Sequence, residues 1–162
     1  MAKAHKENVG VRGFFRVQLT EEGKVVGDSG WRENQVTNDG ISQYIVNWVL
    51  GDTANGKSVT HMALGTGTQP ASNGTALSGE LTHASNARKT VSTSVVSSRT
   101  AQFTAAFNSA DSWLTASANI SNVGLFNTST TNVGTLLAGN TFTSSAVATN
   151  QNVQVTYQVR FS

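Results

Sequence analysis

The carboxylates and histidines are the side chains of this chain that could do acid–base chemistry or hold a metal. The chain has nine Asp and Glu residues and three histidines, His5, His61 and His83. The histidines show neither the His-x-x-x-His spacing nor the His-Glu spacing that zinc enzymes use. Glu80 and Asp111 would suit glycoside hydrolysis only if the fold brought them together, and no pattern requires this. We therefore expect no catalytic residue, no metal and no cofactor.

Glycine- and serine-rich segments could supply two other kinds of site. Gly65-Thr66-Gly67 is like half of a phosphate-binding loop, but it lacks the Lys-Ser/Thr ending and does not open a patterned helix. We interpret these glycines as permitting a sharp chain reversal. The sequence contains no Gly-x-Ser-x-Gly elbow and no Asp-x-Asp-x-Asp calcium loop. It therefore predicts a protein that is not an enzyme.

The low share of charged residues points toward a protein that is covered by neighbours. Charged residues make up 12% of the chain, against about 25% in a typical domain. Thr, Ser and Asn number 21, 18 and 15, and together they are a third of the residues. Such a surface is either a neutral hydrogen-bonding coat or an area buried in an assembly, so a free β-sandwich with a Thr-rich face is the alternative to an assembly subunit.

The charges are also unevenly placed. Residues 1–33 hold six Lys and Arg and five Asp and Glu, whereas from residue 90 onward only Arg99, Asp111 and Arg160 are charged. The formal net charge of +2 is small and mixed in sign, so we expect no nucleic-acid partner. The N-terminal fifth of the chain is instead expected to be a surface of its own.

Cysteine usage and hydropathy limit the setting of the protein. The chain has no cysteine, so no disulfide framework holds it together. Its most apolar segment, residues 44–50, is far shorter than the roughly 20 residues that a membrane span needs. Residues 1–7 are polar and lack the apolar stretch of a secretory signal. We expect a protein folded in a cytoplasm, with no membrane partner.

One helix is predicted near residues 39–50. Apolar side chains recur there at helical spacing and form one stripe, which we interpret as a contact with the core: Ile41, Tyr44, Ile45, Trp48 and Val49. Asn38 or Asp39 is expected to cap the first turn through its side-chain oxygen. Gly51 is expected to end the helix, because glycine enters the left-handed conformation without strain.

The rest of the chain is predicted to form strands. Phe15, Val17 and Leu19 alternate with Phe14, Arg16 and Gln18, and a turn at Glu22-Gly23 allows a return strand over residues 24–26. The clearest strand is the last one, whose apolar positions are Val153, Val155, Tyr157, Val159 and Phe161. Several short strands and one helix predict a mainly β fold, an antiparallel, jelly-roll-like β-sandwich. We divide the chain into an N-terminal arm, residues 1–13, and a single β-sandwich domain, residues 14–162.

Two stretches resemble structural proteins of tailed bacteriophages. The first runs from Trp31-Arg32-Glu33-Asn34-Gln35 through the helix to Leu64-Gly65-Thr66-Gly67 and its Pro70 loop. The second runs from Gly124-Leu125-Phe126-Asn127 to the final alternating strand. The resemblance covers the chain from about residue 31 to its end, and such modules occur in capsid decoration (cement) proteins and in tail or head fibres.

This resemblance implies a virion structural protein that is assembled in the host cytoplasm. One domain and a short arm suit a decoration protein, usually a homotrimer, that binds the major capsid protein or other virion proteins and stabilises the head. Arg12, Arg16, Trp31 and Arg32 are the expected contact residues, because Arg and Trp are favoured in interface hot spots. The alternatives are a tail or head-fibre adaptor for host attachment, with Trp113 as a glycan platform, and a glycan-cleaving virion enzyme.

Overall fold

The chain folds into one curved antiparallel sheet with a helix at one end. The computed structural model describes residues 10–51, 54, 56–82 and 87–162. The strands are β1 (Val11–Glu21), β2 (Lys24–Asp28), β3 (Arg32–Val36), β4 (His61–Gly65), β5 (Lys89–Thr90), β6 (Ser92–Ser97), β7 (Thr100–Phe107), β8 (Ala118–Phe126), β9 (Leu136–Val147) and β10 (Asn152–Phe161). They follow the order β5-β4-β8-β9-β3-β1-β10-β7-β6, and β2 pairs with β1.

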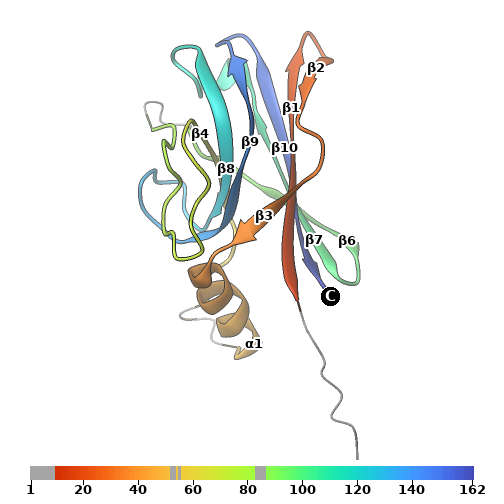
Figure 1. Ribbon diagram of the computed structural model, residues 1–162, viewed down its shortest axis with the longest axis vertical. Coiled ribbons are helices and arrows are strands. Elements are labelled where there is room, and N and C mark those ends of the chain that lie inside the picture. The colour runs from red at the N-terminus through yellow and green to blue at the C-terminus, as the bar shows by residue number, and fades with distance from the viewer. Residues whose placement is uncertain (1–9, 52–53, 55, 83–86) are drawn as a thin grey trace, which may run out of the picture.

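The predicted fold class, mainly β and antiparallel with one short helix, is confirmed. β3 joins the two halves of the sheet, because its first residues pair with β1 and its last residues pair with β9. The sheet therefore curls until it is nearly closed into a barrel-like shape (Figure 1). The finer form of the fold, a jelly-roll-like β-sandwich, stays a prediction.

The alternating strands bury the faces that the sequence predicts. β1 pairs with β10 over its length, and the register places Phe15 opposite Tyr157 and Val17 opposite Val155. All four side chains are buried, and the rings of Phe15 and Tyr157 stack with centroids 6.2 Å apart. Phe161 departs from the predicted pattern, because its side chain lies at the end of β10 and is 37% exposed.

The helix is present, but the start is not capped as predicted. It consists of η1 (Gly40–Val46), which is wound as a π-helix, and α1 (Asn47–Val49). Neither Asn38 nor Asp39 caps it: the Thr37 hydroxyl accepts the hydrogen bond from the Gly40 amide at 2.9 Å and is itself bonded to backbone carbonyls of β9. Gly51 ends the helix with φ +67°, as predicted.

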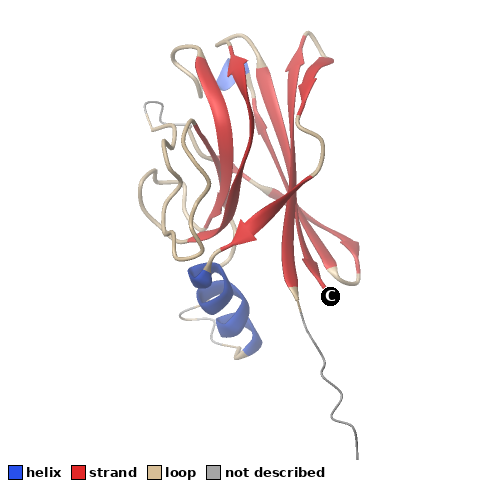
Figure 2. Ribbon diagram, viewed as in Figure 1, coloured by secondary structure: helices blue, strands red, loops and turns tan. Residues whose placement is uncertain are grey.

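The interpretation of the whole apolar stripe as a core contact is wrong. Tyr44 is buried, and its hydroxyl donates a hydrogen bond to the Thr135 carbonyl. Ile41, Trp48 and Val49 are 43%, 80% and 73% exposed. The reason is geometric, because the helix meets β9 only near its start and then stands away from the strands (Figure 2). A stripe of apolar residues needs a surface along its whole length to be buried, and the sheet does not reach that far.

The predicted arm, residues 1–13, overlaps the first strand. β1 begins at Val11, which lies opposite Phe161 of β10. The Gly10 amide and carbonyl are bonded to the backbone of Ser162 at 2.9 Å. Residues 1–9 lie outside the described residues, so an arm deletion that preserves the strand should stop before residue 10.

Candidate interaction surface

The four predicted contact residues lie on β1, at the start of its neighbour β3 or, in the case of Trp31, directly before β3. Arg12, Trp31 and Arg32 are exposed, and Trp31 keeps 45% of its surface. Arg32 donates a hydrogen bond to the Ser29 carbonyl at 3.1 Å, and Arg12 lies 3.9 Å from the Glu33 carboxylate. The structure thus places the predicted residues at the surface; their role in binding stays a prediction.

Arg16 differs from the other three because its charge is used within the chain. Its guanidinium donates two hydrogen bonds to Asp28, at 3.0 and 3.1 Å from Nε, and a further one from Nη2. These bonds hold the pKa of the Asp28 carboxyl well below its usual value, and they raise the pKa of Arg16. Arg16 therefore fixes the β1–β2 hairpin and has less charge to offer a partner.

The exposed end of the helix is a first surface that the sequence did not predict. Trp48, Val49 and Leu50 are 80%, 73% and 73% exposed, and we call these three residues the helix end. Val46, one turn earlier, is also exposed at 44%. Single exposed apolar residues are common, whereas large ones gathered at one point are a feature of interaction sites.

A second surface brings together three arginines from distant parts of the chain. A groove is lined by Arg12 and Phe14 of β1, by Arg99 of the β6–β7 turn and by Arg160 of β10. We call these four residues the arginine groove. Arg12 and Arg160 are directly opposite each other in the β1–β10 register. Like charges in such cross-strand positions destabilise a sheet, so the fold itself gains nothing from this pair.

The Arg160 guanidinium is held in place without being neutralised. Its Nε and Nη2 donate hydrogen bonds of 3.1 and 2.7 Å to the Gln158 side-chain carbonyl, and its Cζ lies 4.2 Å from the centre of the Phe14 ring. Gln158 is in turn bonded to Gln102 at 2.9 Å. Among the described residues, no carboxylate forms an ion pair with Arg99 or Arg160. The groove therefore presents positive charge on a fixed support.

Both surfaces lie at the same end of the long axis. The helix, the start of β1, the end of β10 and the β6–β7 turn all lie toward the lower end in Figure 1. Arg12 is among the contact residues predicted from the sequence, whereas Arg99, Arg160 and the helix end are not. The polar face of the final strand already contained Arg160, but only the pairing of β10 with β1 and β7 brings it beside the other two arginines.

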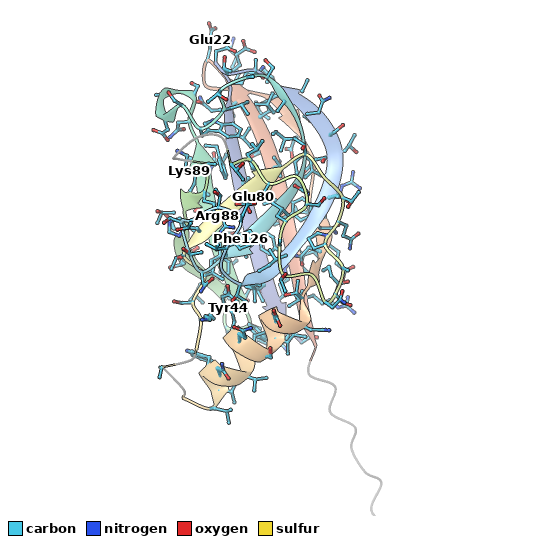
Figure 3. All side chains as sticks on the ribbon, turned by 90° about the vertical axis from the view of Figure 1, so that its left-hand side faces the viewer. Glu22, Tyr44, Glu80, Arg88, Lys89 and Phe126 are labelled. Atoms are coloured by element: carbon cyan, nitrogen blue, oxygen red, sulfur yellow. The ribbon has the colours of Figure 1, made fainter. Side chains whose placement is uncertain are left out.

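In contrast to the exposed arginine groove, an ion pair in the middle of the molecule is buried and bonded only within the chain. Arg88 and Glu80 are joined by two hydrogen bonds of 2.6 and 2.9 Å, and their side chains are 1% and 2% exposed (Figure 3). Arg88 also donates to the carbonyls of Thr128 and Val133 at 3.0 Å and lies 3.7 Å from the centre of the Phe126 ring. All these contacts are internal, so the pair ties the loop after β4 to the loop after β8 and offers nothing to a ligand.

The two carboxylates considered for catalysis are each paired with a cation of the chain. Glu80 is bound to Arg88, and Asp111 is bound to Lys89 at 2.9 Å, so each carboxylate already has a cation. His61 is half-buried, and burial lowers its pKa. Within the described residues, no three His, Cys, Asp or Glu side chains gather as metal ligands would. His5 and His83 lie outside the described part of the chain.

Two further expectations from sequence concern Trp113 and the glycines at the end of β4. Trp113 cannot serve as an exposed glycan platform, because it is 1% exposed and packs edge-on against Phe107 at 5.2 Å. The chain bends at Thr66 and Gly67, and a left-handed conformation is not the reason for the glycines there, because neither Gly65 nor Gly67 has a positive φ. They are needed for close packing instead: a Cβ on Gly67 would lie 2.4 Å from the Ser78 carbonyl oxygen.

Comparisons with known proteins identify no relative of this chain, so its function is inferred from the fold and from the two surfaces. No protein-family model, no curated protein and no solved structure matches the chain. None of the helices in the described residues is long and apolar enough to cross a membrane.

Proposed function

We propose that the chain is a non-enzymatic structural subunit that binds neighbouring proteins in an assembly through its helix-bearing end. The observation that carries this proposal is the exposure of Trp48, Val49 and Leu50 on three consecutive residues. A folded domain gains nothing by leaving such side chains in water. A partner surface that covers them removes that unfavourable hydration.

The energy available at the helix end is large enough to matter for association. Full burial of a Val or Leu side chain contributes about 1.5–3 kcal/mol relative to exposure. Trp is among the residues most often found at binding hot spots. A contact centred on Trp48 and extended over an interface of about 800 Å² per partner would be of the size seen in specific complexes.

The setting that we propose is the head of a tailed bacteriophage, on the ground of the resemblance described above. There the chain would act as a decoration protein, a homotrimer bound to the major capsid protein. Each added contact stabilises only the assembled shell, because a ligand stabilises the form that it binds. Several subunits of one trimer binding together would add avidity to a modest single contact. A tail or head-fibre adaptor is the alternative position in the particle.

The direct test is the occupancy of the chain on purified virus particles. We expect the chain in the particles, and we expect the double variant Trp48→Ser/Leu50→Ser to reduce its ratio to the major capsid protein at least about tenfold. Quantitative mass spectrometry of the particles measures this ratio. The matched control is Val25→Ser/Val26→Ser, which removes two side chains that are each 54% exposed on β2, at the opposite end of the molecule. Particles without the chain, or equal occupancy of the two double variants, would refute the proposal.

The oligomeric state gives a second test that needs only the purified chain. We expect a trimer in sedimentation-velocity analysis. A monomer at all concentrations would contradict the trimeric form of the proposal.

A further inference from the structure

The arginine groove has the chemistry of a carboxylate-binding site. Guanidinium groups bind carboxylates through paired, charge-assisted hydrogen bonds, and they do so best when the planar group is already fixed. Arg160 meets this condition, since Gln158 and the Phe14 ring hold it from two sides. Its neighbour Arg99 is exposed on the β6–β7 turn, and Arg12 lies directly opposite Arg160 in the sheet.

Nothing within the described residues neutralises this charge completely. Glu33 is the nearest described carboxylate to Arg12, at 3.9 Å, and both side chains of that pair are more than half exposed. The guanidinium of Arg160 is bonded to a neutral amide, which orients the group and leaves its charge in place. An anionic partner that spans the groove would remove the repulsion between Arg12 and Arg160.

The surroundings favour a protein carboxylate over a nucleic-acid phosphate. Nucleic-acid surfaces carry many cations along a track, whereas the formal net charge of this chain is +2. The other ion-paired cations of the described residues are bound within the chain, Arg16 to Asp28, Arg88 to Glu80 and Lys89 to Asp111. The helix end, which lies toward the same end of the molecule, offers apolar side chains that a protein surface can cover and a phosphate backbone cannot.

We propose that the arginine groove binds an acidic segment of the protein on which this chain docks, with Asp or Glu carboxylates bridging Arg12, Arg99 and Arg160. The inference rests on the proposed function, because it names the chemistry of the docking partner. The partner surface would combine an acidic segment for the groove with an apolar patch for the helix end. Charge complementarity of this kind fixes the orientation of docking and accelerates association.

The test uses a fluorescein-labelled peptide of six glutamates and the purified full chain, with fluorescence anisotropy as the measurement. We expect binding at low salt that weakens as the salt concentration rises. The variant Arg99→Gln/Arg160→Gln should lose at least about tenfold in affinity, because it removes two charge-assisted contacts. The control variant Lys24→Glu lowers the net charge by the same amount at an exposed position outside the groove and should change the affinity less than about twofold.

Three results would overturn the proposal. The first is no binding of the peptide by the wild-type chain at low salt. The second is an equal loss in the groove variant and in the control variant, since the binding would then depend on net charge alone. The third is a six-nucleotide single-stranded DNA that binds at least as tightly as the peptide and is lost in the groove variant, which would indicate nucleic acid instead. Thermal unfolding of each variant verifies that it is folded.

The peptide assay and the particle assay can fail separately. The peptide assay contains no virus particle, so a failure there removes the arginine groove and leaves the helix end as the docking surface. Absence of the chain from particles would refute the proposed function even if the isolated groove bound glutamate.

Discussion

Two regions of this molecule use arginine in opposite ways. In the middle, Arg88 is buried, bonded to the Glu80 carboxylate and to two backbone carbonyls, and stacked on Phe126. At the helix-bearing end, Arg99 and Arg160 are exposed, and among the described residues no carboxylate pairs with them. Arg88 holds the fold together, whereas Arg99 and Arg160 leave their charges available. The residue type is the same, and only the surroundings separate the two roles.

The tryptophans repeat this contrast. Trp113 is 1% exposed and packs on Phe107, whereas Trp48 is 80% exposed on the last turn of the helix. A buried tryptophan contributes to stability, and an exposed one at a protruding position contributes to binding. The molecule therefore has a stabilising centre and an exposed end that we propose as the docking surface, and substitutions in the two regions should affect different measurements.

The largest effect on stability is expected at the buried ion pair. Arg88→Met leaves the Glu80 carboxylate buried without a cation and should lower the free energy of unfolding by about 3–5 kcal/mol. Urea denaturation measures the loss. The double variant Arg88→Met/Glu80→Gln removes both charges and should be more stable than the single variant. If the double variant were the less stable of the two, the buried charge would not be the cause of the loss.

The helix should divide into a stabilising start and a binding end. Tyr44→Ala removes a buried ring and its hydrogen bond to Thr135, and we expect a loss of about 3 kcal/mol. Trp48→Ala should change the free energy of unfolding by less than about 0.5 kcal/mol, because its side chain touches little of the fold. Both values come from urea denaturation at one pH. Equal losses at the two positions would remove the distinction between the start and the end of the helix.

The contact that seats the helix is expected to tolerate no methyl group. A Cβ on Gly40 would lie 2.0 Å from the carbonyl oxygen of Leu137, which is a backbone atom of β9. Gly40→Ala should therefore shift the helix and lower the free energy of unfolding by about 1–3 kcal/mol. Gly51→Ala, at a left-handed position with open space around it, is a control for backbone strain without a clash. A Gly40→Ala variant with an unchanged free energy of unfolding would show that the helix is not in contact with β9 at this point.

The smallest effect on stability is expected at Arg16 and Asp28, an ion pair whose side chains are partly exposed. Its hydrogen bonds hold the pKa of Asp28 below the unfolded value of about 3.9. The contribution of the pair to stability is therefore present above about pH 4 and is lost as the pH falls further. We expect the difference in urea midpoint between wild type and Asp28→Asn to be small at pH 7 and to shrink below pH 4. A difference that grows on acidification would contradict this sign.

Local patterns predicted the elements well because each carries its own periodicity. The alternation of Val153, Val155, Tyr157 and Val159 set the buried face of β10, and the paired face of β1 followed from Phe15 and Val17. The helix between Gly40 and Val49 and its end at Gly51 were equally local. The capping residue was missed because Thr37 is held by carbonyls of β9, which lie about 100 residues further along the chain.

The candidate surfaces could be predicted only in part. Arg12 followed from its residue type and from the charge of the N-terminal segment, but its neighbours Arg99 and Arg160 come from the middle and from the last strand of the chain. The apolar stripe of the helix predicted burial, and nothing in its spacing indicates where the sheet stops. Glu80 and Arg88 are eight residues apart in an irregular loop, and no periodicity marks them as a pair.

By itself, the sequence determined a mainly β chain with one helix and few charges, because apolar periodicity and composition act over short stretches. The tertiary structure decided which charges are neutralised and which apolar residues stay in water. Those outcomes depend on strand pairing between residues far apart, as in Arg12 beside Arg160, and on the reach of the sheet beneath the helix.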